Sequence, residues 1–136
     1  MRSLSLLVIA SALGSCAADG PVPVRQVAGP RTMEWLLGGK VAGPPVRCLA
    51  DYQRRDMTVL DSETIAFRDG GRRTYVMKLS PGCGQLASGG GALVTRSFGT
   101  SDLCTGDIAR VLDTSSRMIA GSCSIGPITP YERPRT

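Results

Sequence analysis

The cysteines constrain this chain more than any other residue type. The sequence has 136 residues and five cysteines, one near the N-terminus at Cys16 and the others at Cys48, Cys83, Cys104 and Cys123. An even number of cysteines in a small exported chain is typical of a disulfide framework. If Cys16 does not form a disulfide, the remaining four cysteines predict two disulfides. Each would restrict the unfolded chain by roughly 3 to 5 kcal/mol in the loop-entropy model.

Four cysteines can pair in three ways, and the sequence alone does not choose among them. We favour Cys83 with Cys104, which would close the polar, glycine-rich segment between them. We favour Cys48 with Cys123 for the second bond, because it would tie the first residues of the domain to its last. A metal site is disfavoured, because the chain has no histidine and no cysteine pair with C-x-x-C spacing, and exported cysteines are normally oxidised. We expect no other cofactor.

The N-terminus has the three-part layout of an export signal. Arg2 supplies one positive charge, residues 4–13 form an apolar run, and small residues precede Cys16. The apolar run is about half of the roughly 20 residues that a helix needs to cross a bilayer. We therefore expect an export segment and no permanent transmembrane anchor.

The stretch "LGSC" at residues 13–16 resembles the lipobox of bacterial lipoproteins. The resemblance implies cleavage behind Ser15 and lipidation of Cys16, with diacylglycerol on the thiol and a fatty acid such as palmitate on the new amino group. Several acyl chains give stable anchoring where a single chain does not. Ala17 in place of Asp implies, by resemblance to lipoprotein sorting, an outer-membrane anchor on the periplasmic side. The alternative is an ordinary signal peptide cleaved after Ala17 or Ala18.

We divide the chain into a signal peptide at residues 1–15, a tether at 16–31, one domain at 32–131 and a mobile tail at 132–136. The tether is rich in proline, glycine and alanine, and an extended chain of its length reaches roughly 45 Å. Residues 33–39, capped by Thr32 and ended by two glycines, predict one short helix. Its side chains Trp35, Leu36 and Leu37 either plug one end of the core or bind a partner.

The rest of the domain is predicted to be mainly β. Residues 64–67 and 73–79 alternate with the period of half-buried strands, and the Asp-Gly-Gly turn at 69–71 joins them into a hairpin. Further strands are expected at residues 57–60, 93–98, 108–113 and 122–128. Pro127 and Pro130 indicate a sheet edge or a strand end. Five to six short strands with one short N-terminal helix predict a small antiparallel barrel or rolled sheet.

From residue 37 to residue 130 the chain resembles a family of small exported bacterial proteins of unknown function that carry four cysteines at these positions. The matching segments are "LLGGKVAGPPVRC", "VLDSETIAF", "YVMKL", "PGCGQL", "LCTGDIARVLD" and "CSIGPI", of which "LCTGDIARVLD" is the most specific. The chain departs from the family's pattern at Gly84, Gln85 and Ala109. The resemblance supports the domain limits and the cysteines but implies no activity.

The chain is basic, with a formal net charge of +5 and 16 Lys and Arg side chains. Such a charge suits anionic partners, and the exported location disfavours nucleic acid. Arginines cluster at the predicted hairpin and one strand earlier. Guanidinium groups bind phosphate and carboxylate in bidentate fashion, so these residues predict an anion-binding edge: Arg54, Arg55, Arg68, Arg72 and Arg73. The alternative is that they protect a sheet edge by charge.

The absence of histidine excludes Ser-His-Asp and Cys-His catalysis. The carboxylate pairs Asp61 with Glu63 and Asp102 with Asp107 leave one alternative, a small hydrolase acting on envelope glycans. Turn-forming roles are commoner for such residues. We therefore predict a non-catalytic cell-envelope lipoprotein. It would be a binding or accessory module attached to the membrane by its lipid, with an anionic envelope component or an envelope protein as its partner.

Overall fold

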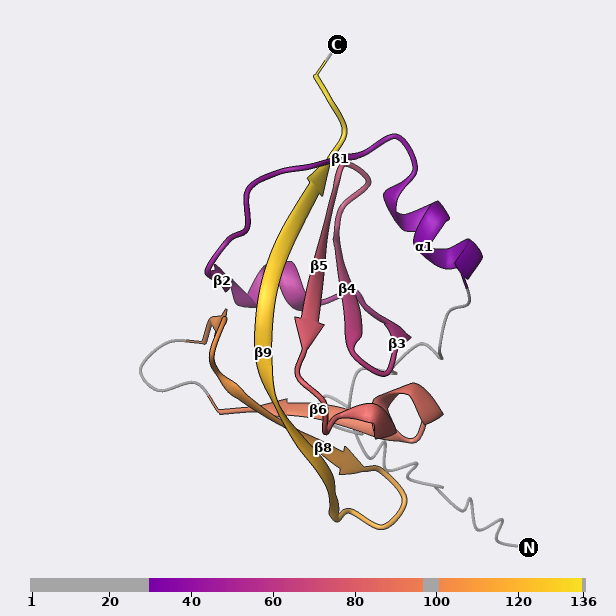
Figure 1. The fold of residues 1–136 in the computed structure, drawn as a ribbon, viewed down its shortest axis with the longest axis vertical. Coiled ribbons are helices and arrows are strands. Elements are labelled where there is room, and N and C mark those ends of the chain that lie inside the picture. Colours follow the sequence, from indigo (N-terminus) through magenta and orange to yellow (C-terminus); the bar gives the residue numbers. More distant parts are fainter. Residues whose placement is uncertain (1–29, 97–100, 136) are drawn as a thin grey trace, which may run out of the picture.

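The computed structural model describes residues 30–96 and 101–135 (Figure 1). The signal peptide, Cys16 and most of the tether lie outside the described residues, as do the last two residues of the strand predicted at 93–98. The fold is mainly β, with a curled antiparallel half-barrel, one short N-terminal helix and two disulfides, which confirms the predicted fold class. Within the described residues, no helix has the length and apolar content needed to cross a membrane.

Six strands form the half-barrel in the spatial order β3-β4-β5-β9-β8-β6. They are β3 (Met57–Asp61), β4 (Thr64–Asp69), β5 (Arg73–Leu79), β6 (Gly91–Thr95), β8 (Ile108–Asp113) and β9 (Ile119–Glu132). Three short strands accompany them: β1 (Val41–Ala42) pairs with β9, and β2 (Cys48–Leu49) pairs with β7 (Leu103–Cys104). The predicted β4–β5 hairpin is confirmed. Asp69 lies opposite Arg73, and Gly70 occupies the turn at a φ of 63°, which glycine adopts readily.

The long strand β9 runs through most of the height of the molecule (Figure 1). Pro127 and Pro130 lie inside it, and β9 has neighbours on both sides, so the prediction of an edge or a strand end is wrong. Pro127 lies between Ile125 and Ile128, where the register with β5 shifts in a β-bulge. A residue in a bulge is not paired with the neighbouring strand, so Pro127 does not have to donate a backbone hydrogen bond. The Pro130 carbonyl accepts the N–H of Gly43 at 2.8 Å. The N–H and C=O of a strand residue point to the same side. The backbone nitrogen of Pro130 therefore faces Gly43, and its lack of an N–H costs no hydrogen bond to β5.

The hydrophobic core fills the inner side of the half-barrel. The 3-10 helix η2 (Gly84–Ser88) contacts both edge strands, β3 and β6, and buries Leu86 between them, so it closes the opening of the sheet. The core consists of Leu49, Val59, Ile65, Phe67, Tyr75, Met77, Leu79, Cys83, Leu86, Leu103, Ala109, Val111, Cys123, Ile125 and Ile128.

The helix α1 (Pro30–Leu37) begins ahead of the predicted cap, so Thr32 lies in its first turn and does not cap it. A proline suits the first helical position because its φ is already near the helical value. Gly39, at a φ of 70°, ends the helix as predicted. Leu36 is 3% exposed and packs with Ala66 on the outer face of the sheet. The helix therefore covers the sheet from outside, and the expectation that it plugs one end of the core is wrong.

The two disulfides join Cys48 to Cys104 and Cys83 to Cys123. Their predicted number is confirmed, but the favoured pairing, Cys83 with Cys104 and Cys48 with Cys123, is wrong. Cys48 and Cys104 lie directly opposite each other in the β2–β7 pair. Cys83 follows Gly82, whose backbone lies so close to β9 that a Cβ on Gly82 would be 2.1 Å from a β9 carbonyl oxygen. Both pairings depend on long-range strand contacts that distance along the chain does not reveal.

Candidate functional site

The predicted anion-binding arginines come from two neighbouring parts of the fold. Arg54 ends the 3-10 helix η1 (Asp51–Arg54) and Arg55 follows it, whereas Arg68, Arg72 and Arg73 belong to the β4–β5 hairpin. The segment that follows η1 pairs with the end of β4. Both groups therefore lie at the end of the sheet that carries the β4–β5 turn.

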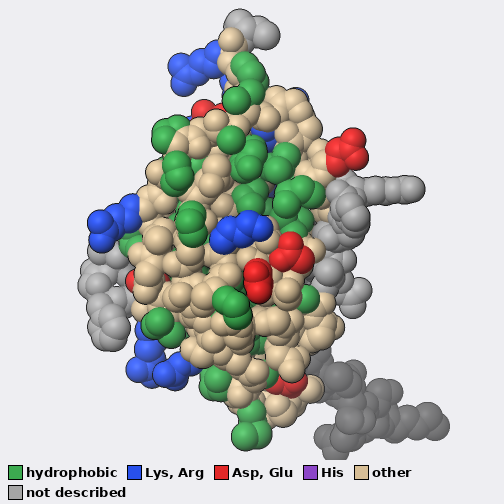
Figure 2. Space-filling model, in the orientation of Figure 1, with side chains coloured by type: hydrophobic (Ala, Val, Ile, Leu, Met, Phe, Trp, Pro, Cys, Tyr) green, Lys and Arg blue, Asp and Glu red, His purple; other side chains and the backbone are tan. Residues whose placement is uncertain are grey.

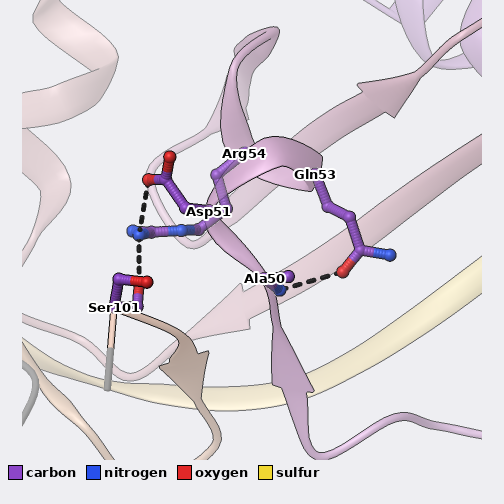
Figure 3. A network of polar contacts seen from close by, with 5 residues as sticks. All are labelled: Ala50, Asp51, Gln53, Arg54 and Ser101. Carbon is purple, nitrogen blue, oxygen red and sulfur yellow. Dashed lines mark hydrogen bonds and ion pairs between the residues drawn. The ribbon is translucent and has the colours of Figure 1, made fainter. Parts of the chain in front are cut away.

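Arg54 ties η1 to the segment that leads into β7 (Figure 3). Its Nη2 atom donates to the Ser101 carbonyl at 2.5 Å and lies 3.2 Å from the Asp51 carboxylate. The Ala50 N–H donates to Gln53 Oε1 at 2.9 Å and begins the same turn. The buried Arg54 Nε has no hydrogen-bond partner among the described residues. The guanidinium of Arg54 is thus engaged within the fold, whereas Arg55 is exposed.

Arg68 connects the hairpin to α1. Its Nη2 atom forms an ion pair with Asp56 at 2.6 Å, and its Cζ atom lies 5.2 Å from the ring centroid of Trp35. The Trp35 side chain is 64% exposed. A tryptophan ring beside a cation has an apolar body and a polar rim, the combination that suits a wet interface.

Arg73 is held by polar neighbours. It forms an ion pair with Glu132, and its Nη1 atom donates to the Tyr75 hydroxyl at 3.2 Å. Gln53 Nε2 donates to the same hydroxyl at 2.6 Å, which links η1 to the hairpin. The hydrogen bond to Tyr75, and after it the one to Glu132, raises the pKa of Arg73. Arg73 therefore stays charged, and the Glu132 carboxylate compensates its positive charge.

Lys40 belongs to the same end of the sheet and was not predicted from the sequence. Its Nζ atom donates to the Leu36 carbonyl at 2.8 Å, near the end of α1, and to Thr74 Oγ1 at 2.6 Å. Burial lowers the pKa of Lys40, and the charges of Arg133 and Arg68 lower it further. The bond to Thr74 spans 34 positions, so no local pattern could have placed this lysine beside β5.

Three arginines at this end, Arg55, Arg72 and Arg133, are exposed, and none forms an ion pair with the residues described. The Arg133 N–H donates to the Arg72 carbonyl at 3.1 Å, so the end of β9 lies beside the β4–β5 turn. We call this region the basic end. It consists of Glu34, Trp35, Lys40, Val41, Arg55, Asp56, Arg68, Asp69, Arg72, Arg73, Glu132 and Arg133.

Two of the four carboxylates considered for a hydrolase, Asp61 and Asp107, make the contacts of turn residues. Asp61 Oδ1 accepts the N–H of Glu63 at 2.8 Å, and Asp107 Oδ2 accepts the N–H of Cys104 at 2.7 Å. Short aspartate side chains commonly stabilise tight turns in this way. These contacts give the hydrolase no support, and it stays a prediction.

A second group of exposed apolar side chains lies at the β8–β9 turn, at the opposite end of the molecule (Figure 1). Met118 is 70% exposed and Ile119 is 53% exposed. Asp113 holds this turn by accepting hydrogen bonds from Ser115 and Ser116. The Ser115 hydroxyl contributes most to holding the pKa of Asp113 at about 2.

Comparisons of the chain with protein-family models, with curated proteins and with solved structures give no match. The resemblance of residues 37–130 to a family of small exported proteins therefore stays an expectation.

Proposed function

We propose that this protein is a non-catalytic lipoprotein of the cell envelope, held at the outer membrane through Cys16 and facing the periplasm as a binding or accessory domain. The observation that carries the proposal is the stretch "LGSC" directly behind a signal-like apolar run. The two disulfides support it, because such bonds form and persist in oxidising compartments such as the periplasm.

The binding role is supported by the basic end. Arg55, Arg72 and Arg133 offer guanidinium groups to the solvent, and a guanidinium binds phosphate or carboxylate through two parallel hydrogen bonds. An anionic component of the envelope is therefore the partner that this domain fits best.

Mass spectrometry of the mature protein from bacterial membranes tests the anchor. We expect the first residue to be Cys16, carrying a diacylglyceryl group on its sulfur and an acyl chain on its amino group. Cys16→Ala should give no acylated species, because the thioether requires the thiol. Ala18→Gly lies outside the "LGSC" stretch and serves as the matched control, with acylation unchanged. An unmodified N-terminus at Ala18 or Asp19 would overturn the proposal.

A crosslinking pull-down from intact envelopes tests the binding role. The acylated protein should capture a reproducible envelope component, and Cys16→Ala should lose it because the domain is no longer held near the membrane. Equal capture by both forms would show that the anchor does not direct the domain to its partner.

A further inference from the structure

The basic end combines exposed apolar side chains with a local excess of positive charge. Trp35 is 64% exposed and Val41 is 62% exposed. Figure 2 shows apolar side chains gathered over the upper part of the sheet, with both basic and acidic side chains near them. An exposed tryptophan flanked by long basic side chains has the composition of a surface that lies at a membrane–water boundary.

The charges of the basic end do not cancel. Asp56 and Glu132 are each paired with an arginine of the β4–β5 hairpin. The remaining cations are Lys40, Arg55, Arg72 and Arg133, and the remaining carboxylates are Glu34 and Asp69, which leaves an excess of two positive charges. Burial is the main cause of the lowered pKa of Lys40, and the charges of Arg133 and Arg68, which lie at the same end, lower it further.

The basic end also lies where the chain would leave the membrane. The helix α1 is the first described element, and it begins at Pro30, so it takes up the last two residues of the tether predicted at 16–31. An extended tether spans roughly 45 Å at most, so an anchor at Cys16 would keep α1 within that distance of the bilayer. Tethering at this range raises the effective concentration of the leaflet around Trp35 and its cations. Even a weak surface contact would then be populated.

We infer that the basic end rests on the anionic phospholipid headgroups of the leaflet that holds the anchor, with Trp35 in the headgroup layer and Arg72 and Arg133 on lipid phosphates. The inference rests on the proposed lipoprotein function and adds an orientation to it. The β4–β5 turn would face the membrane, and the β8–β9 turn would face the periplasm.

Trp35 is the only tryptophan of the chain, so its fluorescence reports on this surface alone. The acylated protein is reconstituted in vesicles of phosphatidylethanolamine and phosphatidylglycerol, with or without bromine on the acyl chains near the headgroups. We expect the Trp35 emission to shift to shorter wavelength and to be quenched by the brominated lipid. Vesicles of phosphatidylcholine should give a weaker shift, because they carry no net charge. An equal shift on both vesicles would overturn the role of charge.

Charge variants test the arginines without the anchor. The chain from Ala17 onward contains every described residue and lacks Cys16. Each basic side chain near an anionic leaflet contributes about 1 kcal/mol, so Arg72→Gln combined with Arg133→Gln should weaken partition to phosphatidylglycerol vesicles roughly 30-fold. The matched control removes two exposed arginines elsewhere, by Arg96→Gln and Arg110→Gln, and should change the partition less than about twofold. Equal losses in both double variants would overturn the assignment of the surface.

The two proposals fail in different ways. A protein that is acylated at Cys16 and whose Trp35 emission does not respond to anionic vesicles would overturn the orientation and leave the lipoprotein intact. An unacylated mature protein whose Trp35 is still quenched on phosphatidylglycerol would overturn the lipoprotein and leave the lipid-binding surface intact.

Discussion

At the scale of single residues, the tightest constraint in the fold lies where two backbones cross. Gly82 has a φ of 121°, and a Cβ added there would lie 2.1 Å from the Ser122 carbonyl oxygen. A Cβ on Gly121 would lie 2.2 Å from the Gly82 carbonyl oxygen. Only glycine lets the two segments approach so closely. This approach brings Cys83 within bonding distance of Cys123.

Gly82→Ala should therefore destabilise the protein strongly. The methyl group meets backbone that cannot move aside, and the positive φ is strained for alanine, so we expect the free energy of unfolding to fall by at least about 3 kcal/mol. Urea denaturation of the oxidised protein measures the change. Gly71→Ala is the matched control, because no atom lies within 4 Å of its Cβ position. A Gly82→Ala protein as stable as the control would contradict the close approach.

Asp113 predicts how stability depends on pH. Its pKa in the folded protein is about 2, below the ordinary value of 3.8, because Ser115 and Ser116 donate hydrogen bonds to the carboxylate. A lowered folded-state pKa stabilises the fold above pH 3.8, and this contribution is lost as the pH falls toward 2. Asp113→Asn should flatten the fall in stability over that interval, as measured by urea denaturation at several pH values. An unchanged pH dependence would show that interactions other than those of the Asp113 carboxylate hold the turn.

At the scale of elements, the two disulfides differ in exposure. Cys83 is 0% exposed and Cys123 is 5% exposed, whereas Cys48 and Cys104 are half-buried in the short β2–β7 pair. Cys48–Cys104 spans 56 positions and Cys83–Cys123 spans 40. In the loop-entropy model each bond stabilises the fold by about 4 kcal/mol, so neither loop length makes one bond much stronger than the other. The exposure of the sulfur atoms to solvent therefore decides which bond a reductant opens first.

A mild thiol reductant should open Cys48–Cys104 before Cys83–Cys123, because thiol–disulfide exchange requires the attacking thiolate to reach a sulfur atom. Stepwise alkylation with two labels, followed by peptide mass spectrometry, gives the order. The Cys48→Ser and Cys104→Ser double variant is the control, and its remaining bond should resist the same reductant. Earlier labelling of Cys83 and Cys123 would contradict the burial that separates the two bonds.

Local elements of this fold could be predicted because their signals are local. The β4–β5 hairpin follows from apolar alternation and an Asp-Gly-Gly turn, and the end of α1 follows from Gly39. The place of β9 could not be predicted, because proline in a strand indicates an edge unless a bulge removes the need for its donor. The disulfide pairing was missed for a related reason, since it follows from which strands meet.

At the scale of the whole molecule, only part of the basic end could be predicted. Arg68, Arg72 and Arg73 are close in sequence and stand out as a cluster. Lys40 and Arg133 reach the same region only because α1 packs on the outer face of the sheet and β9 ends beside the β4–β5 turn. Such a site is assembled by topology, and its members carry no shared motif.

The pairing of β1 with β9 has a mechanical consequence. Val41 lies opposite Glu132, so the chain enters and leaves the sheet as adjacent strands. Tension between a membrane anchor and a partner gripping the C-terminal segment would peel these strands apart one residue pair at a time. On the N-terminal side the peeling halts at Cys48, which is cross-linked to Cys104, whereas β9 is still held by its pairing with β5 from Glu132 to Ile125. Under tension the domain would therefore extend by a short segment, while the rest of its structure stays folded.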